Sequence, residues 1–209
     1  MKKFTLSIVA VMAMGTFAVA GGDIQPVVEP VVEVVAPVAD DSSFYVGLGY
    51  SYMNFQGEGE GEGPYEYDIN GNAFTVLAGY NFNKYFAVEG RYSLTVGDLT
   101  YEEGDYEGDW EGDMTNIALY LKPMYPISEL TLYGLLGYGQ VTLDRDSEEE
   151  FSESGFQWGL GASYAVNDNI GVFVDYTRLY DDTGFDGGGR YEDEDIVIDS
   201  INVGVTYKF

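Results

Sequence analysis

The feature of this chain that most constrains its fold is a period-two alternation of large apolar and small side chains, which runs from residue 43 to the C-terminus. Such alternation is typical of β-strands, because successive side chains point to opposite faces. Each alternating segment is close to the roughly 9–11 residues that a tilted strand needs to cross a bilayer. Eight segments carry the pattern, at about 43–55, 72–82, 85–96, 114–124, 130–143, 155–166, 170–180 and 196–209.

The two faces of these segments differ in size and polarity. In the first, Phe44, Val46 and Leu48 share one face, whereas Gly47 and Gly49 share the other. A water-soluble barrel would expose the small face, yet that face carries few charges, unlike a solvated surface. The opposite arrangement explains the pattern, because the apolar face then meets lipid and the small face fills a narrow lumen. We therefore predict an all-β fold, an eight-stranded antiparallel up-and-down transmembrane β-barrel.

Glycine on the inward face leaves room for large rings in the lumen. The glycines are Gly47, Gly49, Gly79, Gly137, Gly139, Gly159 and Gly161. The rings that we expect to fill this room are Tyr45, Tyr120, Tyr133 and Phe173. A barrel of eight strands is only just wide enough to be filled by side chains, so no wide channel is expected.

The connections between segments alternate between short and long. Short ones lie at 83–84, 125–129 and 167–169, and long ones at 57–71, 97–113, 144–154 and 181–195. Outer-membrane barrels have short periplasmic turns and long external loops, so both termini are expected in the periplasm. Aromatic residues near the segment ends, with Phe44 and Phe209 at one end and Tyr52 and Trp158 at the other, predict two interfacial girdles.

Composition excludes several classes of protein. The chain has no Cys and no His, which excludes disulfides, thiolate metal sites and enzymes that depend on either residue. Its net charge of −27 argues against a nucleic-acid partner, because a phosphate backbone needs a basic surface. The carboxylates Glu89 and Asp175 could in principle perform acid–base chemistry, but no substrate-binding pattern accompanies them. We therefore expect that the protein is not an enzyme.

The N-terminus has the pattern of a secretory signal. Lys2 and Lys3 precede the apolar stretch 4–17, and Ala18-Val19-Ala20 forms a small-residue cleavage site. We expect cleavage of a signal peptide at 1–20; a retained membrane anchor is the alternative, which the short apolar core disfavours. Residues 21–42 carry three prolines among valines and acids and read as a periplasmic linker, because proline at this density blocks helices and central strands. The barrel domain is then 43–209.

Four characteristic motifs lie within these segments: FYVGLGY at 44–50, FAVEGRY at 86–92, LYGLLGYG at 132–139 and VGVTYKF at 203–209. With them the chain resembles the outer-membrane β-barrel superfamily of the OmpA transmembrane-domain type, over 43–209. The resemblance implies a bacterial outer membrane, with its lipid and lipopolysaccharide as surroundings. The alternating Val203, Val205, Tyr207 and Phe209 resemble the signal read by the outer-membrane assembly machinery, which is then a partner during biogenesis. The chain ends at this strand, so the peptidoglycan-binding domain of full-length members is expected to be missing.

Four charged residues fall in the inward phase, namely Glu89, Arg91, Lys122 and Asp175. An unpaired buried ion costs several kcal/mol, so we expect these residues to pair. Lys122 can approach Glu89 from the neighbouring segment, and Arg91 can reach Asp175 across the lumen. A fixed polar plug and a gate that switches partners to admit ions both remain open, and the narrow lumen favours the plug.

The four long loops hold 26 of the 36 acidic residues, which places a strong negative field outside the cell. The second loop repeats Glu-Gly-Asp, and its carboxylates are weak candidate ligands for Ca²⁺ or Mg²⁺: Glu103, Asp105, Glu107, Asp109, Glu111 and Asp113. Their spacing matches neither an EF-hand nor a glycine-rich nonapeptide repeat. A flexible, solvated, repulsive surface is therefore the favoured interpretation, and no cofactor is expected.

Three functions remain open from the sequence. The first is a structural outer-membrane protein that supports the envelope and displays acidic loops, with its lumen plugged by polar and charged side chains. The second is an adhesin that binds an unidentified surface ligand through loop 97–113. The third is a small porin-like channel for ions or solutes. We favour the first, because the loops and the inward charges both have structural explanations.

Overall fold

The computed structural model describes residues 42–60, 64–104, 106–110, 112–145, 149–183 and 195–209. The predicted signal peptide and nearly all of the predicted linker lie outside these residues. No helix in the described ranges is long and apolar enough to cross a membrane. The described residues form the strands β1 (Ser43–Glu60), β2 (Pro64–Asn83), β3 (Phe86–Thr95), β4 (Leu99–Glu103), β5 (Tyr106–Trp110), β6 (Gly112–Ile127), β7 (Leu130–Arg145), β8 (Glu149–Ala165), β9 (Ile170–Thr183) and β10 (Asp195–Lys208).

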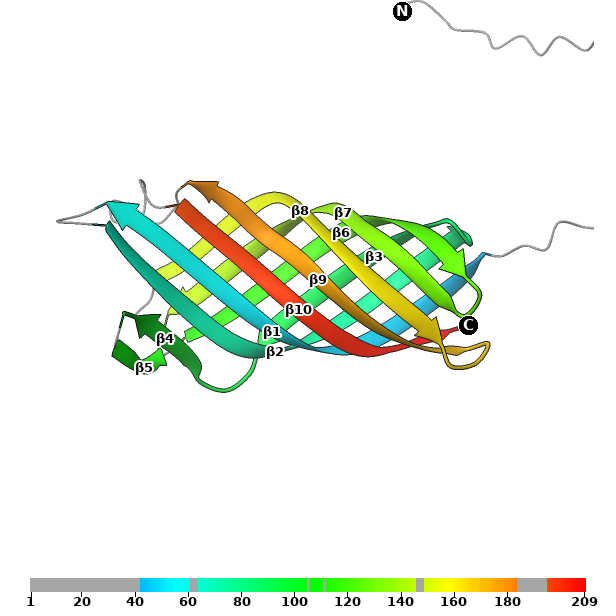
Figure 1. Ribbon diagram of the computed structural model, residues 1–209, viewed down its shortest axis with the longest axis horizontal. Helices are drawn as coiled ribbons and strands as arrows, with labels where there is room; N and C mark the ends of the chain where they lie inside the picture. Colours follow the sequence, from blue (N-terminus) through cyan, green and yellow to red (C-terminus); the bar gives the residue numbers. More distant parts are fainter. Residues whose placement is uncertain (1–41, 61–63, 105, 111, 146–148, 184–194) are drawn as a thin grey trace, which may run out of the picture. The chain divides into compact units, whose positions relative to one another are not determined.

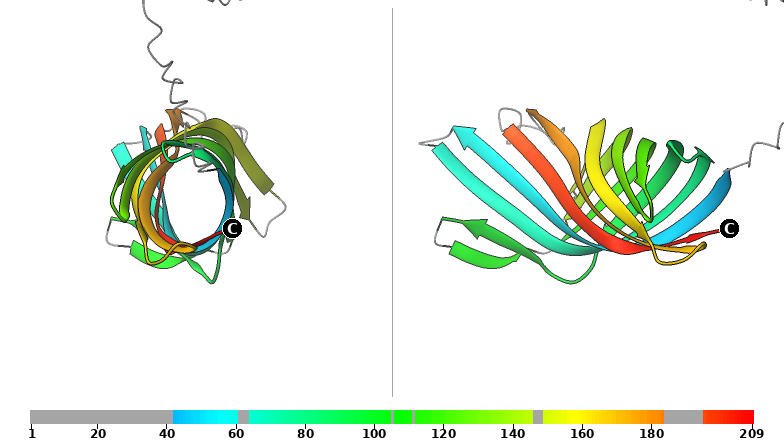
Figure 2. Two further views of the ribbon diagram at one scale, coloured as in Figure 1. Left: turned by 90° about the vertical axis from the view of Figure 1, so that its right-hand side faces the viewer. Right: turned by 45° about the vertical axis from the view of Figure 1, so that its right-hand side comes forward.

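Eight of these strands close into a barrel, as predicted (Figures 1 and 2). Every neighbouring pair is antiparallel, and β1 closes the ring because it pairs with β2 on one side and with β10 on the other. Tyr45, for example, lies opposite Gly79 of β2 and opposite Lys208 of β10. The eight-stranded antiparallel barrel that we predicted is thereby confirmed.

The four connections that we predicted as long, flexible loops need correction, because most of their described residues are paired strand. β1 continues to Glu60 and β2 begins at Pro64, so most of 57–71 belongs to one long hairpin. In 144–154, β8 begins at Glu149, well before its predicted start at 155. The strands β7, β9 and β10 extend only slightly past their predicted ends, to Arg145, Thr183 and Asp195. Glycine and acidic residues are poor strand formers, which misled the prediction. Strand pairing already established lower in the barrel carries these residues into the sheet.

The second predicted loop, 97–113, contains a β-hairpin of its own. Gly97 has a φ of 80°, a left-handed conformation that suits glycine, and it separates β3 from β4. β4 then continues along the same edge of β2, where Asp68 pairs with Glu102 and Asn70 with Thr100. β5 pairs only with β4 among the described strands. The hairpin β4–β5 therefore extends the sheet from the edge of β2 at the loop end and is not one of the eight strands that close the ring (Figures 1 and 2).

The side chains along most of the wall follow the predicted inside-out arrangement. Phe44, Leu48 and Leu119 of the outer face are each more than 60% exposed. The four predicted rings of the lumen, Tyr45, Tyr120, Tyr133 and Phe173, are all buried. Inward glycines make room for them: a Cβ at Gly79 would lie 2.3 Å from the ring of Tyr45, and one at Gly161 would lie 2.6 Å from that of Tyr133. The lumen can be closely packed because each of these rings lies against a glycine, which has no side chain.

Toward the loop end of the barrel the two faces exchange character, which the sequence analysis did not predict. From Ser51 toward the loop end, the inward residues of β1 are Met53 and Phe55, which are both buried. The outward residues there are Asn54 and Gln56. Buried apolar residues from the other strands join them in one cluster, including Ile69, Leu99, Met114, Val141, Leu143, Leu179, Ile196 and Ile198. This end of the barrel therefore has an apolar core and a polar exterior, like a water-soluble protein. We call these residues the apolar cap.

Gly137 and Gly134 of β7 offer a direct test of lumen crowding. We expect Gly137→Val to lower the free energy of unfolding by at least about 1–3 kcal/mol, because its Cβ would lie 2.2 Å from the carbonyl oxygen of Leu119. Gly134→Val is the matched control, since its Cβ meets nothing closer than Pro123 at 3.5 Å. Urea unfolding followed by heat-modifiable gel mobility measures both. Equal stability of the two variants would contradict this packing.

Candidate functional site

The candidate site is the middle of the lumen, where the structure brings together all four charged residues predicted to face inward. Glu89 and Arg91 come from β3, Lys122 from β6 and Asp175 from β9. Each lies in the inward phase of its strand and is buried. The site therefore holds two cations and two anions, with no excess formal charge.

Arg91 links the two carboxylates. Its guanidinium donates to Asp175 through Nη1–Oδ1 at 2.9 Å and Nη2–Oδ2 at 2.8 Å, and its Nε donates to Glu89 Oε1 at 2.7 Å. The bond to Asp175 is bidentate, the geometry in which a guanidinium holds a carboxylate most specifically. Arg91 thus connects β3 to β9, which are not neighbours in the barrel.

Lys122 completes the ion pairs, with its Nζ 2.6 Å from Glu89 Oε2. The ammonium group also lies 4.1 Å from the ring centre of Tyr133, close enough for a cation–π interaction. The hydroxyl of Tyr45 donates to Glu89 Oε2 at 2.6 Å, and that of Tyr133 donates to Asp175 Oδ2 at 2.7 Å. Each buried carboxylate therefore has several donors, which offsets the cost of its removal from water. We call these four charged residues and two tyrosines the charge network.

Neutral polar residues extend this site toward the loop end, and apart from Tyr120, which was expected as an inward ring, the sequence did not single them out. Tyr120 donates to Gln157 at 2.5 Å, and Gln157 donates to Asn116 at 2.8 Å. On the other side, the hydroxyl of Thr75 lies 2.7 Å from those of both Ser51 and Ser93. All these residues are buried and lie in the inward phase, so polarity at inward positions was the available signal. The apolar cap lies beyond them.

The outward residues of the wall change from apolar to polar at a common level. On β7, exposed Tyr138 is followed by Gln140, and on β8 the residue paired with Tyr138 is Phe156, beside Ser154. On β1, Tyr52 is followed by Asn54. Below this level the wall is a continuous apolar surface, which only lipid can cover favourably. Above it the wall is polar and the interior becomes apolar, so the surroundings change there from lipid to water.

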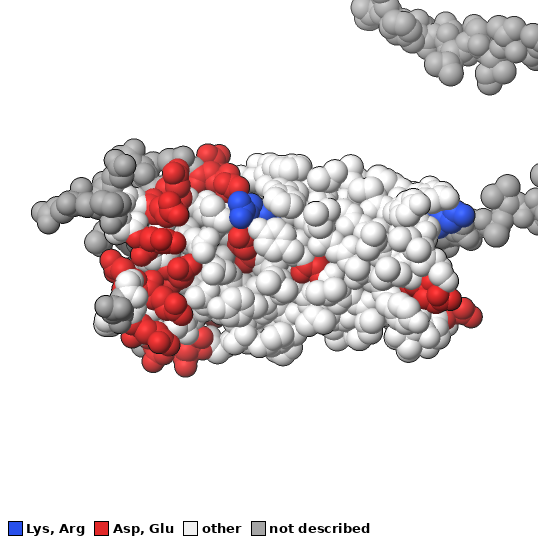
Figure 3. Space-filling view, in the orientation of Figure 1, with Lys and Arg blue, Asp and Glu red and all other residues white. Residues whose placement is uncertain are grey.

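Acidic residues gather beyond this level, at the end that carries β4 and β5 (Figure 3). Four of the six candidate metal ligands, Glu103, Glu107, Asp109 and Asp113, are among the described residues, and Asp105 and Glu111 are not. The described part of the chain contains no group of three or more carboxylates arranged to hold a metal ion. Glu103 instead accepts a hydrogen bond from Tyr101 at 2.7 Å. Cation binding by the full repeat stays a prediction.

The C-terminal strand places the residues of the predicted assembly signal on the outer wall. The side chains of Val203, Val205, Tyr207 and Phe209 are all exposed on this face. The backbone N–H of Phe209 donates to the carbonyl oxygen of Phe44 at 2.9 Å, beside the junction of the first and last strands. Recognition by the assembly machinery stays a prediction.

A closed eight-stranded barrel with an apolar outer wall and a polar interior defines a transmembrane β-barrel. The family model of the outer membrane protein beta-barrel domain matches residues 28–209. The chain belongs to this family and is a protein of the bacterial outer membrane.

Solved structures of outer-membrane proteins share the fold. Ail of Yersinia pestis is 21% identical, with a TM-score of 0.52 and coverage of 81% of this chain and 99% of Ail. OprG of Pseudomonas aeruginosa is 15% identical, with a TM-score of 0.55 and coverage of 81% and 97%. Neisserial surface protein A is 18% identical, with a TM-score of 0.53 and coverage of 80% and 99%. No curated protein sequence is significantly similar to this chain.

We expect Arg91→Met to lower the free energy of unfolding by about 3–5 kcal/mol, because Glu89 and Asp175 would each lose a buried charged partner. Arg178→Met is the control. Arg178 also bonds two carboxylates, Asp199 and Asp181, but its side chain is 25% exposed on the outer wall, so a loss of about 1 kcal/mol or less is expected. Urea unfolding in lipid vesicles gives both values. Equal losses would contradict the importance of the charge network.

Proposed function

We propose that this protein is a structural component of the outer membrane that supports envelope integrity. Its closed barrel anchors the acidic strand ends and the hairpin β4–β5 outside the cell. The observation that carries the proposal is the charge network, in which Arg91 bridges Glu89 and Asp175 while Lys122 neutralises Glu89. The proposal assigns the protein no catalytic role. Its partners are then outer-membrane lipid, lipopolysaccharide and, during biogenesis, the assembly machinery.

The bonding of the network supports a closed lumen over a gate. Any opening would have to separate Arg91 from Asp175. Each ion that then stayed in the buried lumen without a partner would cost several kcal/mol. A recess of about 200 Å³ enters the periplasmic end and is lined by Lys122 and Phe173. Beyond it come the network and then the apolar cap, where Met53, Leu99 and Ile198 are fully buried. An ion would have to disrupt two layers of different chemistry.

A second candidate function is adhesion through the segment 97–113. The observation that favours it is the hairpin β4–β5, which lies outside the closed ring of eight strands and carries carboxylates on both strands. Ail of Yersinia pestis has been crystallised with sucrose octasulfate, a heparin analogue and therefore a polyanion. The carboxylates at this end of our chain would repel such a ligand. If the hairpin binds a surface partner, we expect that partner to be cationic.

Conductance in planar bilayers tests the closed lumen. We expect no stable openings from the purified barrel, and none from Lys122→Met, because Arg91 still bridges Glu89 and Asp175 in that variant. Stable wild-type openings whose amplitude changes in Arg91→Ala would establish a channel and overturn the proposal. Heat-modifiable mobility confirms that each variant is folded before it is measured.

Deletion of 97–113 tests adhesion independently of conductance. If the barrel serves only as an envelope component, cells that carry the deletion should attach to surfaces like wild type. A loss of attachment on deletion, with the same loss in Glu102→Gln/Glu107→Gln/Asp109→Asn, would establish adhesion through the acidic hairpin. The neutralised variant keeps the length of the hairpin, so it separates charge from steric effects. Surface exposure of each variant is checked by protease accessibility.

A further inference from the structure

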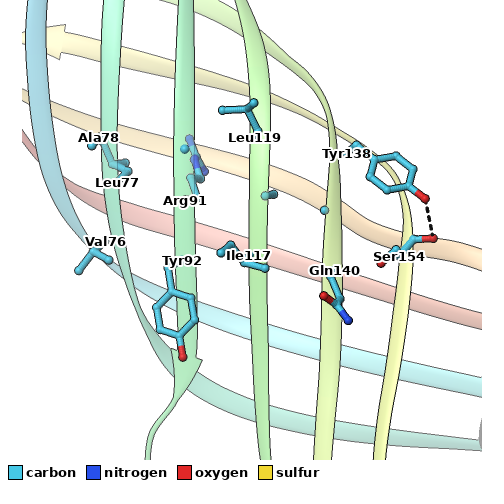
Figure 4. Close-up of a pocket in the computed structure, with 13 residues that line it drawn as sticks. Val76, Leu77, Ala78, Arg91, Tyr92, Ile117, Leu119, Tyr138, Gln140 and Ser154 are labelled. Atoms are coloured by element: carbon cyan, nitrogen blue, oxygen red, sulfur yellow. Dashed lines mark hydrogen bonds between the residues drawn. The ribbon is translucent and has the colours of Figure 1, made fainter.

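The outer wall of the barrel contains one feature that the proposed function does not use, an apolar groove of about 720 Å³ that runs across β2, β3, β6 and β7 to the edge of β8 (Figure 4). It lies below the level at which the wall becomes polar, within the lipid-facing surface. The outward residues that shape it are Ala78, Gly90, Tyr92, Ile117, Leu119 and Tyr138. The groove is therefore a depression in the membrane-embedded surface, and it is separate from the lumen.

Strand register explains the depression. Ala78 of β2 lies opposite Gly90 of β3, and Gly90 lies opposite Leu119 of β6. The wall thus places an alanine and a glycine next to each other, while Tyr92 and Leu119 rise beside them. The floor is backbone, because Gly90 contributes no side chain.

Nothing in the protein itself requires glycine at this position. A Cβ at Gly90 would meet only the carbonyl oxygens of Ala118 and Ala78, both at 3.9 Å, which is ordinary van der Waals contact. The backbone of Gly90 is also outside the left-handed region that favours glycine. The inward glycines differ, since a Cβ at Gly137 would lie 2.2 Å from a backbone carbonyl. The space above Gly90 is therefore left free by the protein and is open on the lipid side.

The groove has an apolar and a polar end. Gln140 and Ser154 line it at the level where the outer wall becomes polar, and the hydroxyl of Tyr138 donates to the carbonyl oxygen of Ser154 at 3.4 Å. Arg91 contributes to the floor, but its guanidinium faces the lumen and is bonded to Glu89 and Asp175. No free cationic group among the lining residues faces a headgroup phosphate. The groove is thus shaped to recognise an apolar chain, with polar contacts only where that chain ends.

We propose that this groove binds one acyl chain of an outer-leaflet lipid, with the headgroup beside Gln140 and Ser154. The site is continuous with the lipid-facing wall, so a bilayer lipid is the molecule that the membrane presents to it. A second copy of this chain fits less well, because its equivalent surface is also hollow and two hollows do not fill one another. Recognition rests on the shape of the groove and not on headgroup charge.

Photo-cross-linking with a lipid that carries a diazirine on its acyl chain tests the proposal. The full-length protein is reconstituted into phospholipid vesicles that contain this probe, and the labelled residues are mapped by mass spectrometry. We expect labelling to concentrate on Tyr92, Ile117, Leu119 and Tyr138. Gly90→Leu, which places a side chain on the floor of the groove, should reduce labelling there by at least about fourfold, the change in occupancy for the loss of one methylene from an apolar contact.

Gly134→Leu is the matched control, because Gly134 also lies on the outer wall but does not line the groove. It should leave the labelling unchanged, and heat-modifiable mobility should show that both variants are folded. Uniform labelling around the wall, or unchanged labelling in Gly90→Leu, would overturn the proposal. So would labelling that appears only when lipopolysaccharide is added, since the groove would then need a particular headgroup. Cross-links between two barrels at these residues would show that a second copy occupies the groove.

Discussion

The structure depends on the fact that hydrocarbon supplies no hydrogen-bond partners. Every backbone N–H and C=O in the membrane must then pair within the protein, and a sheet achieves this only by closing on itself. The double pairing of β1, with β2 and with β10, provides this closure. Closure at eight strands in turn fixes a lumen so narrow that side chains fill it. The glycines, the inward rings and the charge network all follow from this one geometric limit.

The barrel is surrounded by lipid along one part and by water along another, and the polarity of its two faces differs between these parts. In lipid the outer wall is apolar and the interior is polar, whereas beyond Tyr52 and Tyr138 the exterior is polar and the apolar cap fills the interior. The strands β1 and β2 both cross this level without a break. The strands therefore keep their pairing across this level, while the sequence changes which face carries the apolar side chains to match the surroundings.

Much of this arrangement could be predicted from sequence because period-two patterning reports which side chains share a face. The outward position of Phe44, the inward position of Tyr45 and the pairing of Glu89 with Lys122 all follow from phase and strand order. The extension of the strands beyond the membrane did not, because glycine and glutamate at 57–60 carry no hydrophobic signal. The apolar cap escaped prediction for a different reason. Two of its members, Ile69 and Leu99, lie in segments taken as loops, so their inward phase had no strand to refer to. Others, such as Met53 and Val141, lie within predicted strands, where we expected an apolar outer face and a small or polar inner face along the whole strand.

The reach of Arg91 has a consequence for how the molecule comes apart and assembles. Its partner Asp175 lies on β9, separated from β3 by intervening strands in either direction around the ring. A barrel that opened at any seam could not flatten into an open sheet without breaking this bond, because the two strands face each other across the lumen. The ion pair therefore links the two halves of the ring directly, in addition to the backbone pairing around the wall.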